Sequence, residues 1–172
     1  ETFGQLIDMI TEATIAYLSR QIDAGAEAVQ LFDTWASALP ETAFAQWCIE
    51  PAQRIVSALR EAYPHVPVIG FPRGAGVALI DYAARTGVQG IGLDSAVPAA
   101  WARQKIQSQC TVQGNLDPLM LVAGGTAMTN EVRRIVKAFK SGPFVFNLGH
   151  GILPHTPPDH VAELVAAVRS AG

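Results

Sequence analysis

Residues 66–94 read VPVIGFPRGAGVALIDYAARTGVQGIGLD and contain one strand–helix–strand unit. The apolar run 66–71 has the length of a buried strand, and Pro72-Arg73-Gly74 closes it. A helix is predicted over 77–85, and the next strand is predicted at 90–94. A strand, a helix and a strand in this order predict parallel pairing through a right-handed crossover.

The same unit recurs on both sides of this stretch. Three more apolar runs have the length of strands, at residues 28–32, 111–115 and 144–148. Helices are predicted around them, at about residues 1–25, 51–63, 99–107, 130–140 and 158–169. Five apolar strands that alternate with helices predict an α/β fold with a parallel sheet covered on both faces.

Two architectures fit this alternation, an open doubly wound sheet and a (β/α)8 barrel. The glycines never form G-x-G-x-x-G between a strand and a helix, which disfavours a dinucleotide-binding sheet. A barrel gathers the residues at its strand ends into one site, so polar residues at every strand end favour the barrel. Such residues are Asp33-Thr34, Arg73, Asp94, Gln113 with Asn115 and Asp117, and Asn147 with His150.

The length indicates part of a barrel. Five β/α units in 172 residues give about 34 residues per unit, so eight units would need roughly 275. We therefore expect residues 1–172 to form a single partial domain, the C-terminal portion of a TIM barrel with about five β/α units. The N-terminal portion is expected to be absent from this sequence, which begins Glu-Thr-Phe without an initiator Met.

The composition narrows the function classes. With 49% hydrophobic residues and 16% charged residues, the chain is typical of a globular domain rather than a disordered one. A formal net charge of −3 gives no sign of nucleic-acid binding. No apolar window has the length of a membrane span, and Cys48 and Cys110 lack metal-ligand or redox spacing. A cytoplasmic protein with buried, reduced thiols is expected.

His150 is the sharpest candidate for chemistry. It follows a predicted strand in Asn147-Leu148-Gly149-His150-Gly151, where two glycines allow the backbone to approach a ligand closely. The alternative is a histidine whose ring is satisfied by loop backbone. His65 and His155 are interpreted as turn and loop residues, and His160 as a residue on a helix surface.

Other strand ends carry further candidates. Arg73 could pair with an anionic substrate or form a salt bridge within the barrel mouth. Thr34 could donate a hydrogen bond to a carboxylate, while Asp33 could orient Arg73 or act as a cap. Asp94 is interpreted as a member of a structural ion pair at a strand end, in preference to a catalytic residue.

The stretch Gln113-Gly114-Asn115-Leu116-Asp117-Pro118 could line a pocket or form a turn in which Asp117 caps the segment after Pro118. Zinc-ligand spacing, a Walker loop, G-x-S-x-G and H-E-x-x-H are all missing from the sequence. The sequence motifs therefore indicate no metal site, no nucleotide-binding site and no covalent nucleophile.

Five segments together resemble uroporphyrinogen decarboxylase. They are QLFDTWAS at 30–37, FPRGAG at 71–76, GLD at 92–94, QGNLDP at 113–118 and FNLGHGILPHTPPDHV at 146–161. They follow the order of the family over essentially the whole chain, and the combination of QGNLDP with NLGHG is highly specific.

The resemblance implies a carboxy-lyase with a (β/α)8 barrel, usually a homodimer, that acts in porphyrin (haem and chlorophyll) biosynthesis. Members of the family remove carboxyl groups from the four acetate side chains of uroporphyrinogen III, which gives coproporphyrinogen III. They need no metal or organic cofactor. A protonated pyrrole serves as the electron sink, so the protein holds an anionic macrocycle and stabilises positive charge on a pyrrole.

The family motifs also imply roles for individual residues of this chain. The resemblance implies substrate binding by His150 of NLGHG and by Thr34, where many relatives have Ser. It places Phe32 in the pocket wall and Arg73, where relatives often have Lys, near the cleft. The family's catalytic Asp, its R-Q-A-G-R segment and its substrate-binding Tyr have no counterpart here, so no catalytic residue is assigned and the chain alone is expected to be inactive.

Two alternatives remain open. The related cobalamin or coenzyme-M methyltransferases share the barrel but bind zinc through His-x-Cys and a later Cys, where this chain has Phe71-Pro72-Arg73 and Leu148-Gly149-His150. A half-barrel that binds tetrapyrroles without turnover is the non-enzymatic alternative.

Overall fold

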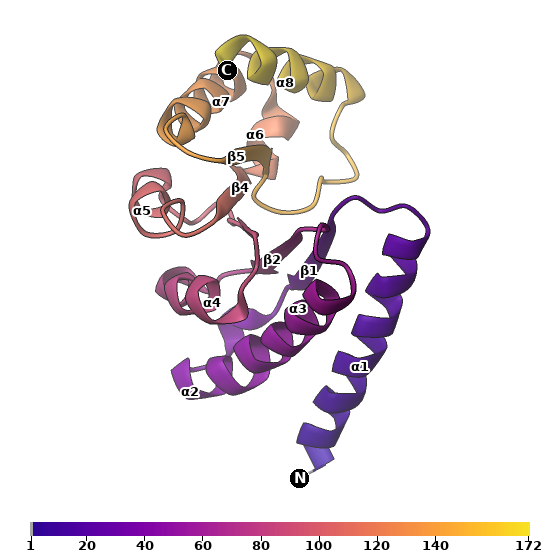
Figure 1. Ribbon diagram of the computed structural model, residues 1–172. Helices are drawn as coiled ribbons and strands as arrows, with labels where there is room; N and C mark the ends of the chain where they lie inside the picture. Colours follow the sequence, from indigo (N-terminus) through magenta and orange to yellow (C-terminus); the bar gives the residue numbers. More distant parts are fainter. Residues whose placement is uncertain (1) are drawn as a thin grey trace. The chain divides into compact units, whose positions relative to one another are not determined.

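The computed structural model describes residues 2–172 and confirms the α/β class. Strands alternate with helices along the chain, and the paired strands run parallel. The chain divides into two compact units, Glu1–Ile91 and Gly92–Gly172, whose elements are labelled in Figure 1.

The first unit contains three strands, and neighbours in the chain are neighbours in the sheet. β1 pairs with β2 from Val29↔Val68 to Asp33↔Pro72, and β2 pairs with β3 through Ile69↔Gly90 and Gly70↔Ile91. In chain order its elements are α1 (Thr2–Asp23), β1 (Val29–Asp33), the 3₁₀ turn η1 (Ala36–Ala38), α2 (Glu41–Phe44), the π-helical turn η2 (Ala45–Ile49), α3 (Glu50–Ala62), β2 (Val68–Pro72), the 3₁₀ turn η3 (Gly76–Ala78), α4 (Leu79–Thr86) and β3 (Gly90–Gly92), whose last residue begins the second unit.

Helix α3 shows why these segments are helical. Its buried residues Ala52, Ile55, Val56 and Leu59 recur at the helical period, so one face enters the core while the other stays polar. Pro51 stands in the first turn, where its missing N–H costs nothing. The helix predicted over about 51–63 is therefore confirmed.

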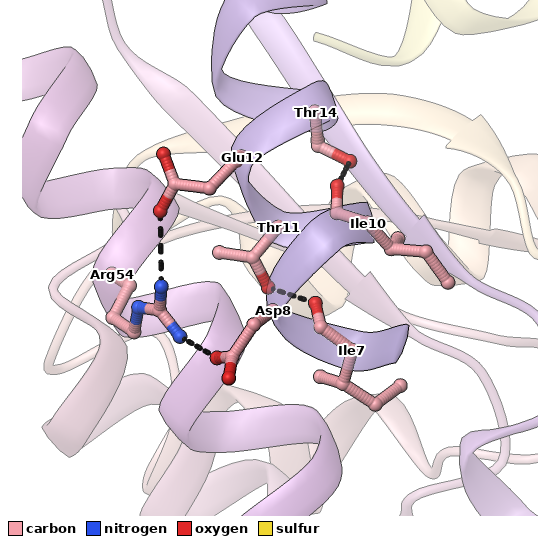
Figure 2. Close-up of polar contacts among 7 residues, drawn as sticks. All are labelled: Ile7, Asp8, Ile10, Thr11, Glu12, Thr14 and Arg54. Carbon is pink, nitrogen blue, oxygen red and sulfur yellow. Dashed lines mark hydrogen bonds and ion pairs between the residues drawn. The ribbon is translucent and has the colours of Figure 1, made fainter. Parts of the chain in front are cut away.

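Helix α1 packs against α3 and is tied to it by charge (Figures 1 and 2). Figure 2 shows the Arg54 guanidinium of α3 between two carboxylates of α1: it donates to Asp8 and, at 3.0 Å, to Glu12 Oε1. All three side chains are largely exposed, so these two ion pairs add little stability.

Much of the apolar surface of α1 is not used within the first unit. The helix buries only Thr11 and Leu18. Its exposed large apolar side chains are Phe3, Leu6, Met9, Ile10 and Tyr17. Such a contiguous apolar face is unusual on the surface of a monomer and indicates a contact surface.

The second unit contains β4 and β5, which pair from Val112↔Phe144 to Leu116↔Leu148. Residues 144–148 form β5 as the sequence predicts. In chain order the elements are α5 (Ala99–Lys105), β4 (Thr111–Leu116), α6 (Pro118–Ala123), α7 (Gly125–Phe139), β5 (Phe144–Leu148) and α8 (Pro158–Ala171). The side chains of Ile106, Val112, Leu116, Met128 and Phe139 are fully buried and form its core.

The helices after β4 differ from the prediction. Residues 118–123 form the short helix α6, and α7 begins at Gly125 rather than at Asn130. Gly124 separates the two helices with a φ of 65°, a conformation that glycine adopts easily. The predicted loop at 123–125 is thus only a one-residue break, because glycine allows a sharp change of direction between two helices.

Across the part of the chain that the structure describes, no helix combines the length and the apolar character needed to cross a lipid bilayer.

Candidate functional site

Phe32 lies on β1 opposite Phe71 of β2, its partner in the register. The two rings meet edge to face, with centroids 6.0 Å apart. Phe71 is buried, whereas the Phe32 side chain is 69% exposed. Phe32 therefore presents a supported aromatic ring at the surface of the first unit, where an apolar ligand face could stack on it.

Thr34 and Arg73 follow the ends of β1 and β2, and the backbone holds these ends side by side. The Arg73 N–H donates to the Asp33 carbonyl oxygen at 3.0 Å, one residue beyond the last ladder pair. Both side chains are half-buried. Among the described residues no salt bridge involves Arg73, so the salt-bridge alternative finds no support and its cation is available to an anion.

A hollow of about 750 Å³ lies next to these strand ends in the first unit. It is lined by Ser37 after β1, by Gly74 after β2 and by Asp81 and Arg85 of α4, among others. Phe32, Thr34 and Arg73 are not in its lining. The sequence did not indicate this hollow, because its lining comes from turns and helices that are distant in the chain.

The Asp33 side chain lines a hollow of about 260 Å³ in the first unit, together with Cys48 and Tyr82. Burial and the nearby Asp33 carboxylate raise the pKa of the Cys48 thiol. The two predicted roles of Asp33, orienting the Arg73 side chain or capping, stay predictions. No sequence motif connects Asp33 with Cys48.

The thiols should react slowly in the folded protein. Burial raises the pKa of Cys110 from 9.0 to about 11, so at pH 8 its thiolate population falls about hundredfold relative to an unfolded chain. Iodoacetamide labelling of Cys110 followed by mass spectrometry should show this retardation, with a rate that rises as the pH rises toward 11. Equal labelling of the native chain and of the chain in urea would contradict it.

In the second unit, His150 lies in the loop after β5 and is exposed. In the described part of the chain its ring makes no hydrogen bond, so the alternative of a ring satisfied by loop backbone finds no support. Both ring nitrogens can therefore meet a ligand, one as donor and one as acceptor when the ring is neutral.

The loop that follows β3 is held by Asn115 of β4. The Asn115 Nδ2 donates to the carbonyl oxygens of Asp94 at 3.0 Å and Val97 at 2.8 Å, and the side chain is only 5% exposed. Asp94 itself accepts from the Ala96 N–H at 2.9 Å. These bonds support a structural role for Asn115, and Asp94 shapes the same segment 94–97 through a backbone N–H; the ion pair predicted for Asp94 stays a prediction.

The segment 94–97 also lies against Gly149, the residue before His150. A Cβ at Gly149 would stand 2.4 Å from the Ser95 nitrogen, so only glycine fits here. The Gly149 N–H donates to the Leu116 carbonyl oxygen at 2.7 Å. At Gly151, by contrast, a Cβ would meet no atom within 4 Å. Of the two glycines around His150, one is needed for packing and the other borders open space.

Three further predictions concern single residues of this unit: a helix cap, a loop residue and a helix residue. Asp117 caps α6, since its side chain accepts from the Leu119 N–H at 2.9 Å, as predicted. His155 is an exposed turn residue, also as predicted. His160 lies on a helix, α8, as predicted, but it is half-buried: its Nδ1 lies 3.0 Å from the Leu121 carbonyl oxygen and its ring fills the space over Gly124, because α8 packs on α6.

Phe32, Thr34 and Arg73 are thus brought together at neighbouring strand ends of the first unit, and His150 stands after the last strand of the second. Their roles in binding a substrate stay predictions. Within residues 2–172, no three His, Cys, Asp or Glu side chains are grouped so that they could hold a metal ion.

Comparisons with known proteins agree with the family resemblance found in the sequence motifs. The family model for uroporphyrinogen decarboxylase (URO-D) matches residues 1–171. The uroporphyrinogen decarboxylase of Rhodospirillum rubrum is 55% identical over 170 residues, which are 99% of this chain and 49% of that protein. That of Granulibacter bethesdensis is 52% identical over 99% of this chain and 50% of its own length. The chain spans about half the length of these curated relatives.

A solved structure agrees with the fold. A methyltransferase from Methanosarcina mazei superposes with a TM-score of 0.76 at 25% identity, covering 95% of this chain and 48% of that one. This likeness confirms the prediction of a partial (β/α)8-barrel fold. Together with the family match over almost every residue, it confirms the resemblance found in the motifs: the chain belongs to the uroporphyrinogen decarboxylase family.

Proposed function

We propose that the protein to which this chain belongs is a uroporphyrinogen decarboxylase. It would convert uroporphyrinogen III into coproporphyrinogen III by releasing its four acetate carboxyl groups as CO2. The observation that carries the proposal is the 55% identity to the Rhodospirillum rubrum enzyme along 99% of this chain. We further propose that the protein works in the cytoplasm as a homodimer, as is usual in the family.

The described residues suit the substrate chemistry. Uroporphyrinogen III is a flexible macrocycle of four pyrroles joined by methylene bridges, with carboxylates around its rim. Arg73 can pair with a carboxylate, and the Thr34 hydroxyl and the His150 ring can donate hydrogen bonds to others. The exposed ring of Phe32 can cover an apolar face of the macrocycle. In this proposal these four residues bind and orient the substrate, while the family's catalytic Asp comes from a part of the protein outside this chain.

We also propose that residues 1–172 form one partial domain that is completed by further barrel units. The share of the relatives that the chain matches, 49% of the Rhodospirillum rubrum protein, supports this. So does the exposed apolar face of α1, which would pack against the remaining units.

A segment-swap chimera tests the function. In the Rhodospirillum rubrum relative, the 170-residue segment that matches this chain is replaced by the chain itself. We expect this chimera to decarboxylate uroporphyrinogen III at a rate within about tenfold of the parent enzyme, because the chain supplies its own Phe32, Thr34, Arg73 and His150 and is 55% identical to the segment that it replaces. The isolated chain, assayed as a control, should give no turnover. A chimera that folds like the parent but releases no CO2 would contradict the proposal.

His150→Asn in the chimera should weaken substrate binding more than folding. The KM for uroporphyrinogen III should rise about tenfold, equivalent to about 1.4 kcal/mol, because the shorter asparagine amide does not place a donor where the far nitrogen of the imidazole ring lies. The melting temperature should stay within about 2 °C, since the ring is exposed. Unchanged kinetics together with a large loss of thermal stability would show that His150 is a structural residue.

A further inference from the structure

The loop that carries His150 has few contacts of its own. It runs over residues 149–157, between the end of β5 and the start of α8, without a helix or a strand. Its exposed residues are His150, Gly151, Ile152, Pro154 and His155. Among the described residues, those at 150–156 make hydrogen bonds only within this segment, from the Thr156 N–H to the Leu153 carbonyl oxygen at 3.0 Å. The position of the loop is therefore set at its two ends.

The first end of the loop is fixed at the end of β4. The Gly149 N–H donates to the Leu116 carbonyl oxygen at 2.7 Å. The chain passes from Leu116 directly into α6, which Asp117 caps by accepting from the Leu119 N–H at 2.9 Å. The start of the loop is thus tied to the beginning of the segment 116–125.

The second end of the loop is fixed on the same segment by α8. The His160 Nδ1 lies 3.0 Å from the Leu121 carbonyl oxygen of α6. Because a carbonyl oxygen only accepts, Nδ1 carries the hydrogen and donates it. One turn further along α8, the Glu163 Oε2 accepts from the Gly125 N–H at 3.2 Å, where α7 begins. The segment 116–125 therefore holds both ends of the loop.

The ring of His160 also lies directly on Gly124. A Cβ at Gly124 would stand 2.6 Å from the Cε1 of this ring and 2.7 Å from both of its nitrogens. A Cβ at Gly125 would meet no atom within 4 Å, although both glycines have a φ of 65°. Glycine at position 124 thus leaves the room that the ring needs to reach Leu121. Close packing and a hydrogen bond coincide at this one side chain.

We propose that His160 is a positioning residue, which holds the end of the 149–157 loop on α6 so that the His150 ring keeps its place at the substrate. His160 acts through the loop and touches no substrate. This inference rests on the proposed function for its substrate, and on the second unit alone for its geometry.

Substitution of His160 in the chimera tests this inference. His160→Ala removes the ring and its hydrogen bond. It should raise the KM for uroporphyrinogen III about fivefold while kcat stays within about twofold, because a binding group moves and the reacting centre does not. In His160→Asn the amide nitrogen replaces Nδ1 and can donate to Leu121, so most of the affinity should return. His155→Ala is the matched control, since this histidine is an exposed turn residue of the same loop; its kinetics should not change.

The two glycines give a second test that leaves His160 in place. Gly124→Ala and Gly125→Ala carry the same backbone strain, because both residues have a φ of 65°, but only the first pushes against the ring. Gly124→Ala should raise the KM about fivefold, whereas Gly125→Ala should leave it within about twofold of the parent value. An equal rise in both variants would contradict the positioning role.

Hydrogen exchange of the Thr156 backbone amide is a readout that needs no activity. This amide donates within the loop, to the Leu153 carbonyl oxygen. Its exchange should speed up about tenfold in His160→Ala and in Gly124→Ala, because the end of the loop is released from α6. The rate should stay near that of the parent in His160→Asn and in Gly125→Ala.

The outcomes separate the positioning role from the proposed function. If the chimera without substitutions releases no CO2, the proposed function fails, and exchange at Thr156 alone decides whether His160 holds the loop. The positioning role is wrong if His160→Ala leaves both the KM and the exchange of Thr156 unchanged, or if it lowers thermal stability and only that. It is also wrong if His160→Asn behaves like His160→Ala.

Discussion

Asn115→Asp should lower the free energy of unfolding of the chimera by about 3–5 kcal/mol, the largest effect expected in the second unit. The amide of Asn115 donates both of its hydrogens, to the Asp94 and Val97 carbonyl oxygens at 3.0 and 2.8 Å. In the aspartate an acceptor oxygen would face those two acceptors. The side chain is only 5% exposed, so water cannot solvate the new charge.

Asn147→Asp is the matched control for this substitution. Asn147 is the register partner of Asn115 on β5, but its side chain is exposed and its Oδ1 accepts from the Leu148 N–H at 2.8 Å. A carboxylate can accept the same bond, so stability should change by less than about 0.5 kcal/mol. Urea denaturation measures both variants. Equal effects at the two positions would show that the hydrogen bonds of Asn115 do not hold the segment 94–97.

Gly149→Ala should cost about 1–3 kcal/mol of stability and should also raise the KM for uroporphyrinogen III. The new Cβ would lie 2.4 Å from the Ser95 nitrogen and 2.8 Å from its Cα. These are backbone atoms, which cannot turn aside as the end of a side chain can. Either the segment 94–97 or the loop of Gly149 must move, and His150 follows Gly149 directly.

Gly151→Ala provides the control on the other side of His150. A Cβ at Gly151 meets no atom within 4 Å, so the fold should tolerate the methyl group. Thermal unfolding and steady-state kinetics of the two variants should therefore differ clearly. A loss of stability at Gly151 that matches the loss at Gly149 would contradict the tight packing of Gly149 on Ser95.

The sequence predicted most of the secondary structure because each strand is a short apolar run with a polar end. The strand at 144–148 has the predicted bounds. The helix predicted over 158–169 begins as predicted and ends two residues later, at Ala171. The break at Gly124 misled the prediction, since two adjacent glycines look like a loop when the helices beside them are unknown. The contact of His160 could not be predicted for a related reason: only tertiary packing places its ring on α6.

Motifs indicated the residues of the candidate site but not the contacts behind them. His150 and Arg73 stand out in the sequence because they are polar residues at strand ends. Cys48 is buried in a π-helical turn, a feature without a sequence pattern. The role of Asn115 likewise depends on carbonyl groups of another loop, which become neighbours only on folding.

Product analysis of the chimera tests the proposed decarboxylase activity most directly. The chimera is incubated with uroporphyrinogen III, and both the porphyrinogen product and the released CO2 are measured. We expect coproporphyrinogen III and four CO2 per substrate molecule, with no added metal or organic cofactor. A folded chimera that leaves uroporphyrinogen III intact, or that transfers a methyl group instead, would contradict this activity.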